Sequence, residues 1–167
     1  MLTGLALLFV GAVLVLNSLW MWGRISDKEI VLINLAVAGI TASVAAITAI
    51  GAQDIMAVKS AALTLLFSTT YLWFAYNRLT GVDGRGLGWF SLFVAVTVVP
   101  VCLQDSWRAD GFLNLWLALS WGVWAVLWFM FFLLLTLKKP ISNATAAVTL
   151  FSGIFTGWLP ALAILLG

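Results

Sequence analysis

Residues 112–137 read FLNLWLALSWGVWAVLWFMFFLLLTL and contain no charged side chain. At about 1.5 Å per residue, a helix of this length crosses the roughly 30 Å hydrocarbon core of a bilayer. An uncharged apolar run longer than about 18 residues is typical of a membrane-spanning helix. This stretch therefore predicts a protein whose solvent is lipid.

The composition of the whole chain supports the same conclusion. Hydrophobic residues make up 64% of the 167 residues and charged residues 8%, and the mean hydropathy is +1.16. A soluble domain carries roughly 25% charged residues, so these few charges exclude a water-soluble fold. A single cysteine, Cys102, excludes a disulfide framework. The eight Lys and Arg residues are scattered and form no patch for nucleic acid.

The charged residues separate six apolar stretches. Each stretch is long enough to span a membrane as a helix, and the short segments between them leave no room for a second domain. The sequence therefore predicts an all-α integral membrane protein with one six-helix transmembrane domain over residues 1–167. The predicted helices are Leu2–Trp22, Ile30–Ile50, Ala61–Asn77, Leu87–Leu103, Phe112–Leu137 and Ala144–Leu166.

The distribution of basic residues predicts the orientation of the chain. Cytoplasmic loops carry an excess of Lys and Arg. The loops after the first, third and fifth stretches hold six basic residues and the opposite side holds Lys59 and Arg108, so both termini are predicted to lie outside. The helices then form three hairpins, which are either related by an internal repeat or unrelated. The six basic residues of the loops after the first, third and fifth stretches are Arg24, Lys28, Arg78, Arg85, Lys138 and Lys139.

Missing residue types restrict the possible functions. The chain has no histidine, and no charged side chain lies well inside a predicted span. Ion-coupled transport and voltage sensing use such side chains, and metal, haem or nucleophilic chemistry would need His, paired Cys or an intramembrane base. We therefore expect no cofactor, no metal and no enzymatic activity. Passive passage of an uncharged solute and a purely structural scaffold both remain.

Tryptophans mark one face of the fifth predicted helix. Trp121, Trp124 and Trp128 are spaced i, i+3, i+7, which places them on the same side. Trp124 falls at the middle of the span, where an indole N–H has neither water nor a headgroup as a partner. Either these rings fill a helix interface, or they form a flat-walled slot that holds a planar solute.

The first predicted helix carries a matching stripe. Leu7, Val10, Leu14 and Asn17 form an apolar line that ends in one amide. A polar side chain at this depth bonds a neighbouring helix or lines a cavity.

Small residues at i, i+4 spacing, among them Gly153 and Gly157, allow helices to approach closely, within one chain or between copies.

With these features in view, the chain resembles the bacterial urea and amide channel family AmiS/UreI. The similarity covers nearly the whole length and rests on five segments that occur in order at matching intervals. These are MLTGLALLFVGAVLVLN (1–17), LLFSTTYLWFAYN (65–77), VDGRGLGWFSLFVAV within 81–100, WGVWAVLWFMFFLLL (121–135) and IFTGWLPAL (154–162).

The resemblance implies three twisted helical hairpins, a homo-hexameric ring with one pore in each protomer, and a place in the bacterial plasma membrane. It also implies which residues line the pore. These are Leu7, Val10, Leu14, Asn17, Trp121, Trp124, Leu127 and Trp128, with Thr69, Trp73, Leu117 and Ser152 at further positions where the chain departs from the acid-activated urea channel.

The departures favour the amide-transporting branch. Histidines of longer outer loops gate the acid-activated relative, whereas this chain has short loops and no histidine, so we expect permeation nearly independent of pH between about 5 and 8. The expected function is facilitated diffusion of urea or short aliphatic amides such as acetamide, with membrane lipid around the protein and a cytoplasmic amidase or urease as the partner enzyme. A non-transporting membrane scaffold is the alternative.

Overall fold

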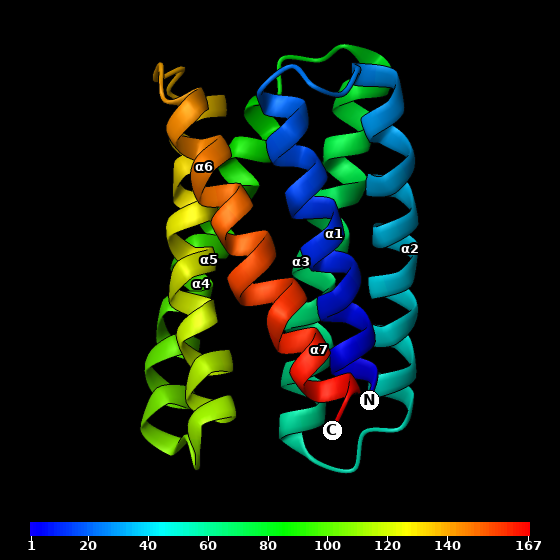
Figure 1. Ribbon diagram of the computed structural model, residues 1–167, viewed down its shortest axis with the longest axis vertical. Coiled ribbons are helices and arrows are strands. Elements are labelled where there is room, and N and C mark those ends of the chain that lie inside the picture. Colours follow the sequence, from blue (N-terminus) through cyan, green and yellow to red (C-terminus); the bar gives the residue numbers. More distant parts are fainter.

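The computed structural model of the chain describes all residues, 1–167, and contains only helices. Six spans are long and apolar enough to cross a membrane, as predicted. The first five are α1 (Leu2–Met21), α2 (Asp27–Ile50), α3 (Ile55–Thr80), α4 (Arg85–Arg108) and α5 (Phe112–Leu135) (Figure 1). The sixth consists of α6 (Ser142–Ser152), the π-helical turn η1 (Gly153–Trp158) and α7 (Leu159–Leu165).

Several helices extend beyond the apolar stretches that predicted them. Helix α3 begins at Ile55 rather than Ala61, because the Asp54 side chain accepts a hydrogen bond from the Ala57 backbone N–H at 2.8 Å and caps the helix. Helix α4 continues to Arg108 and so includes Asp105, whose carboxylate lies 2.6 Å from Lys59 of α3. Charged residues that end an apolar run can therefore still belong to the helix.

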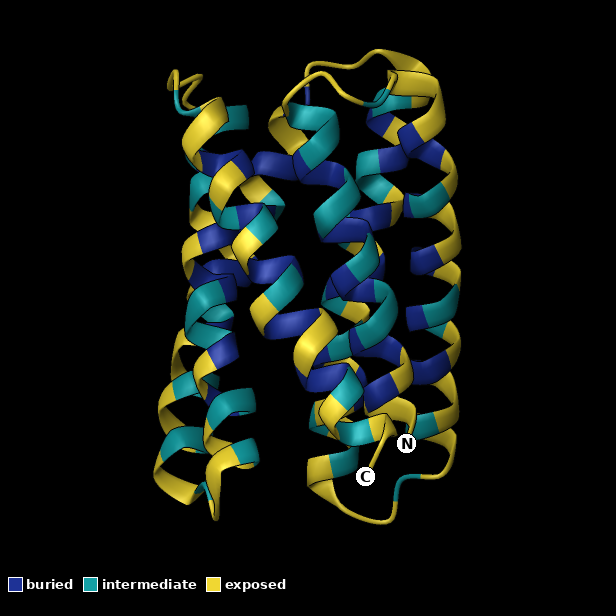
Figure 2. Cartoon of the chain, viewed as in Figure 1, coloured by how far each residue is buried: buried dark blue, intermediate teal, exposed yellow.

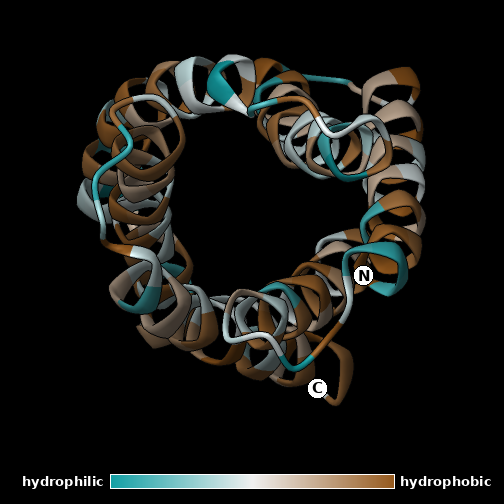
Figure 3. Cartoon of the chain, turned by 90° about the horizontal axis from the view of Figure 1, so that it is seen from above, coloured by the Kyte–Doolittle hydropathy of each residue, from teal (hydrophilic) through white to brown (hydrophobic).

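The six spans form a ring around a central axis (Figure 3). Helix α1 packs against α2 on one side and against α6, η1 and α7 on the other, while α2 packs on α3 and α4 on α5. Contacts between α3 and α4 are sparse, and α5 meets α6 to complete the ring. The sixth span runs obliquely in the wall of the ring, between the α4–α5 pair and α1 (Figure 1).

Both chain ends lie at the same end of the bundle, and the turns after α1, α3 and α5 lie at the other end (Figure 1). This agrees with an even number of spans and with the three predicted turns. The most extensive helix contacts are those of α2 with α3 and of α4 with α5. Each of these pairs is joined by a loop at the end of the bundle that holds the chain termini (Figure 1). Which end faces the cytoplasm stays a prediction from the basic residues.

Small residues allow α1 and the π-helical turn to touch backbone to backbone. A Cβ atom built on Gly11 would lie 2.5 Å from the Trp158 backbone nitrogen, and one built on Gly153 would lie 2.9 Å from that of Val15. The predicted Gly153 and Gly157 spacing thus serves packing within the chain. Of the two possibilities left open by the sequence, the intramolecular one accounts for these glycines.

Burial separates the two faces of each helix (Figure 2). Side chains such as Val13, Val37 and Val94 are fully buried. The outward faces carry large apolar groups, with Leu32 75% and Phe93 61% exposed. Exposed apolar surface on this scale fits lipid or a neighbouring protein rather than water.

Candidate functional site

Four cavities follow one another through the ring and share wall residues. At the end that holds the termini are a cavity of about 210 Å³, here the terminal vestibule, and one of about 100 Å³, the side chamber. A central cavity of about 30 Å³ follows, and a cavity of about 300 Å³, the far vestibule, lies at the opposite end. Trp124 borders the first three cavities, and Phe74, Leu87 and Phe131 border the last two. The row therefore narrows sharply at its middle.

The narrow section is built from aromatic rings gathered around Phe67 of α3. The Phe67 ring centroid lies 4.7 Å from that of Trp124 in an edge-to-face arrangement and 4.9 Å from that of Trp128. Trp121 lies 6.0 Å from Phe67 and 4.8 Å from Trp124. Tyr71, one turn along α3, stacks on Phe67 at 6.2 Å. Edge-to-face and stacked pairs of this kind each contribute about 0.5–1.5 kcal/mol beyond the burial of the rings.

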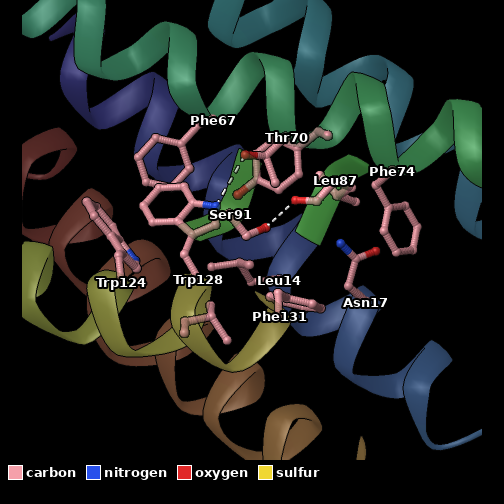
Figure 4. Close-up of a pocket in the computed structure, with 12 residues that line it drawn as sticks. Leu14, Asn17, Phe67, Thr70, Phe74, Leu87, Ser91, Trp124, Trp128 and Phe131 are labelled. Atoms are coloured by element: carbon pink, nitrogen blue, oxygen red, sulfur yellow. Dashed lines mark hydrogen bonds between the residues drawn. The ribbon is translucent and has the colours of Figure 1, made fainter. Parts of the chain in front are cut away.

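Polar groups are few in the central cavity, and two of them have no partner (Figure 4). The Trp128 indole N–H donates to the Thr70 hydroxyl at 3.2 Å, and the Ser91 hydroxyl donates to the Leu87 carbonyl at 2.8 Å. The Trp124 Nε1 and the Tyr71 hydroxyl are buried and make no hydrogen bond with the protein. Buried donors without partners are rare in folded proteins, and these two belong to residues that line the cavity.

Asn17 lines the central cavity and also joins two helices. Its side chain and that of Asn34 in α2 exchange amide hydrogen bonds of 3.2 and 2.8 Å. Asn34 also donates to the Ile30 carbonyl at 2.9 Å and is fully buried. The sequence left open whether Asn17 bonds a neighbouring helix or faces a cavity, and the structure places it in both roles.

The structure brings the two predicted stripes together. All eight residues of the main set border the row of cavities: Leu7, Val10 and Trp121 at the side chamber, Leu14, Asn17, Leu127 and Trp128 at the central cavity, and Trp124 at both. Leu117, from the further set, borders the terminal vestibule.

The other three residues of the further set lie elsewhere. Thr69 is exposed on the outside of α3 and donates to the Leu65 carbonyl. Trp73 packs between α3 and α4, with its ring 5.7 Å from Phe90. Ser152 is fully buried and donates to the Val148 carbonyl at 2.8 Å. None of the three borders the cavities.

This corrects the positions carried over from the resemblance onto α3. Two aromatic residues of α3 that border the cavities, Phe67 and Tyr71, lie two positions before Thr69 and Trp73, respectively. Two residues turn a helix by about 200°, so the shifted positions fall on the opposite face. The aromatic residues that border the cavities from α3 thus lie on the face opposite to Thr69 and Trp73.

Seven wall residues of the central cavity were not predicted. A signal for the α3 members exists, because Phe67, Tyr71 and Phe74 are spaced i, i+4, i+7 and share a helical face. No comparable pattern marks those of α4, which is apolar on nearly every side. The seven are Phe67, Thr70, Tyr71, Phe74, Leu87, Ser91 and Phe131.

Charged groups are confined to the two vestibules. Lys59 and Asp105 border the terminal vestibule, and Asp27 and Arg78 border the far vestibule, whereas the central cavity has no charged wall residue. An ion would have to leave water there without compensation, which costs far more than the desolvation of a neutral amide. The wall therefore suits an uncharged, planar solute.

The sequence model that describes the AmiS/UreI family transporters matches residues 2–167. This chain belongs to the AmiS/UreI family. A Mycolicibacterium smegmatis protein named for the transport of amidate substrates is 40% identical over 98% of this chain and 76% of its own length. The acid-activated urea channel of Helicobacter pylori strain J99 is 34% identical over 95% of this chain and 94% of its own length.

The fold of an AmiS/UreI relative is also known. The cryo-electron microscopy structure of the Helicobacter pylori urea channel in its closed state superposes with a TM-score of 0.87 at 30% identity, covering 98% of this chain and 97% of that one. The family resemblance and the all-helical fold predicted from the sequence are confirmed. As a member of the AmiS/UreI family, the chain is a multi-pass membrane transport protein and not an enzyme.

Proposed function

We propose that this protein is a passive channel for urea and short aliphatic amides such as acetamide in a bacterial plasma membrane. One observation carries the proposal. The row of cavities inside a single protomer narrows to an uncharged aromatic section in which the Trp124 N–H and the Tyr71 hydroxyl have no protein partner. The urea and amidate relatives support the same solute class.

The two free groups match the chemistry of an amide. The Trp124 N–H can donate to the carbonyl oxygen of a solute, and the Tyr71 hydroxyl can accept from its NH₂ group. The Phe67 and Trp128 rings lie 4.9 Å apart and are tilted by 48°, so a flat solute gains contact with a ring face only when the two rings move apart. Part of the lost hydration is thereby replaced without any charged group.

The small central volume requires single-file passage. A cavity of about 30 Å³ holds only one or two water molecules. A solute therefore passes when the rings of Phe67 and Trp128 shift, and side-chain motion of this kind needs no energy source. Diffusion down a gradient is sufficient to drive transport.

No titrating gate is included in the proposal. The chain has no histidine, so no side chain with an ordinary pKa near 6.5 can change its charge at neutral pH. We infer permeation nearly independent of pH between about 5 and 8.

The proposal extends to assembly and partners. Each protomer has its own row of cavities, so a homo-hexameric ring would carry one pathway in each copy. The apolar outward faces, which include Leu32 and Phe93, leave surface for neighbouring copies and for lipid. A cytoplasmic amidase or urease is the enzyme class that would consume the solute.

Swelling of proteoliposomes in a stopped-flow instrument tests the function. We expect protein-containing vesicles in urea and acetamide gradients to equilibrate faster than empty ones, with a smaller acceleration for glycerol, which is not planar. Thr69→Ala, on the outer face of α3, is the matched control and should leave the rates unchanged. No acceleration for any amide by folded protein would refute the proposal and favour a scaffold.

A further inference from the structure

The far vestibule holds a second pair of polar groups without protein partners. Asn77 is only 3% exposed and its Oδ1 accepts no hydrogen bond, and the neighbouring Arg78 has a buried Nε that donates none. Both residues border this cavity of about 300 Å³. Consecutive residues of a helix point about 100° apart, and both side chains nevertheless border the same cavity.

The surroundings hold the Arg78 side chain in one orientation. Its guanidinium lies 5.1 Å from the centroid of the Trp20 ring and 5.9 Å from that of Phe74, and one terminal nitrogen is 3.9 Å from the Asp27 carboxylate. Asp27 accepts the Trp20 indole N–H at 2.6 Å. A group fixed in this way loses little freedom when it binds a ligand.

The opposite vestibule differs in this respect. There the Lys59 ammonium donates to Asp105 at 2.6 Å and to Gln104 at 2.9 Å. The charged groups of the terminal vestibule are therefore paired with each other, whereas the far vestibule keeps one acceptor and one donor free. The two mouths of the pathway are not chemically equivalent.

The geometry points to a second solute-binding site in the far vestibule, at Asn77 and Arg78. The free Arg78 Nε–H donates to the carbonyl oxygen of urea or of a primary amide, and Asn77 Oδ1 accepts from the solute NH₂ group. The inference rests on the proposed function for the identity of the solute. Because Phe74, Leu87 and Phe131 also border the central cavity, a solute held here waits directly next to the narrow section.

A site of this kind changes the solute concentration at which transport saturates, but it does not change the permeability measured at low solute concentration. At low concentration the barrier at the aromatic section sets the rate, and a binding site beside it changes that rate little. At high concentration the occupied site slows exchange. Loss of one neutral hydrogen bond should weaken the site roughly three- to tenfold.

Exchange of radiolabelled urea across proteoliposomes, with equal urea on both sides, tests the inference. We expect Asn77→Leu to raise the half-saturating concentration about three- to tenfold and to leave the low-concentration permeability unchanged. Ser142→Ala, which removes an exposed hydroxyl from the same cavity, is the control and should saturate like the wild type. Wild-type saturation by folded Asn77→Leu would overturn the site, as would exchange that does not saturate at molar urea.

Anomalous diffraction from wild-type crystals soaked in selenourea gives a test that needs no variant. We expect a selenium peak between Asn77 and Arg78, and its absence while a peak forms beside Tyr71 and Trp124 would overturn the inference. The two proposals fail differently. Without any accelerated urea flux the channel itself is refuted, whereas normal flux with an empty far vestibule refutes only the second site.

Discussion

Gly157 of the π-helical turn lies against Gly11 of α1 so closely that a Cβ atom on Gly157 would stand 2.6 Å from the Gly11 Cα. The contact is between two backbones, which cannot turn aside as a flexible side chain can. It closes the ring between the first and last spans. The π-helical turn brings the backbone of the sixth span against α1, so packing between these spans depends on the absence of a side chain at this point.

Gly157→Ala is therefore expected to destabilise the protein by about 1–3 kcal/mol, the usual effect of overpacking a tight contact. The measurement is thermal unfolding in detergent, followed by tryptophan fluorescence. Gly39→Ala is the control, because a Cβ there meets nothing within 4 Å, and it should leave the stability unchanged or slightly raised. Equal unfolding temperatures for the two variants would contradict the assigned contact.

Trp124→Phe should separate transport from packing. Phenylalanine keeps a ring against Phe67 but lacks the N–H that has no protein partner. We expect stability close to wild type and urea permeability lower by about fivefold, which corresponds to one hydrogen bond of about 1 kcal/mol. Trp124→Ala, in contrast, should lose about 3–5 kcal/mol of stability through cavity formation.

Stopped-flow permeability and thermal unfolding, measured on the same preparations, decide this prediction. If Trp124→Phe transports urea at the wild-type rate, the indole N–H has no part in passage. If both variants change only stability, the tryptophans act as packing groups and the scaffold alternative gains support.

The residues predicted from the sequence border the cavities from α1 and α5, whereas the residues that border them from α3 and α4 were not predicted. Leu14 and Trp128 belong to stripes that can be recognised in the sequence, because the residues of each stripe recur at regular helical spacing. In α3 polar and aromatic residues surround the helix, so the direction of Phe67 depends on how α3 turns against α5. The π-helical turn at Gly153–Trp158 likewise could not be predicted from its own residues, because its contacts are with other helices. It packs against Gly11, and the Trp116 indole N–H donates a hydrogen bond to the Phe155 carbonyl at 2.8 Å.

The corrected position on α3 makes a direct prediction. Phe67→Ala removes the ring at the centre of the aromatic section and should widen it, raising glycerol permeability relative to urea by severalfold. Thr69→Ala changes a side chain on the outer face and should leave this ratio unaltered. Swelling rates of proteoliposomes in the two solutes provide the ratio. A change of selectivity in Thr69→Ala alone would restore the position carried over from the family.

Permeability to urea should stay constant between about pH 5 and 8, since histidine is absent. In the Gly81–Gly84 turn, hydrogen bonds from the Arg85 backbone N–H and guanidinium hold the pKa of Asp83 below its ordinary value. A depressed pKa adds stability that is complete above the unfolded-state pKa and is lost as the pH falls through the folded-state value. For Asp83 this loss of stability occurs below about pH 4, which is outside the range of about pH 5 to 8 over which urea permeability is measured. Activation of flux on acidification from pH 7 to 5 would contradict the prediction.

Asn17 and Asn34 should depend strongly on each other in their contributions to stability. Asn17→Leu leaves the fully buried Asn34 amide without its partner in α1, and we expect a loss of about 1–2 kcal/mol. Asn17→Leu combined with Asn34→Leu removes both amides and should be less destabilised than the sum of the single variants. Thermal unfolding of the four proteins forms a double-mutant cycle, and urea flux through the double variant reports separately on the amide that faces the central cavity. Additive losses would show that the two side chains act independently, and unchanged flux would show that Asn17 contributes only to helix packing.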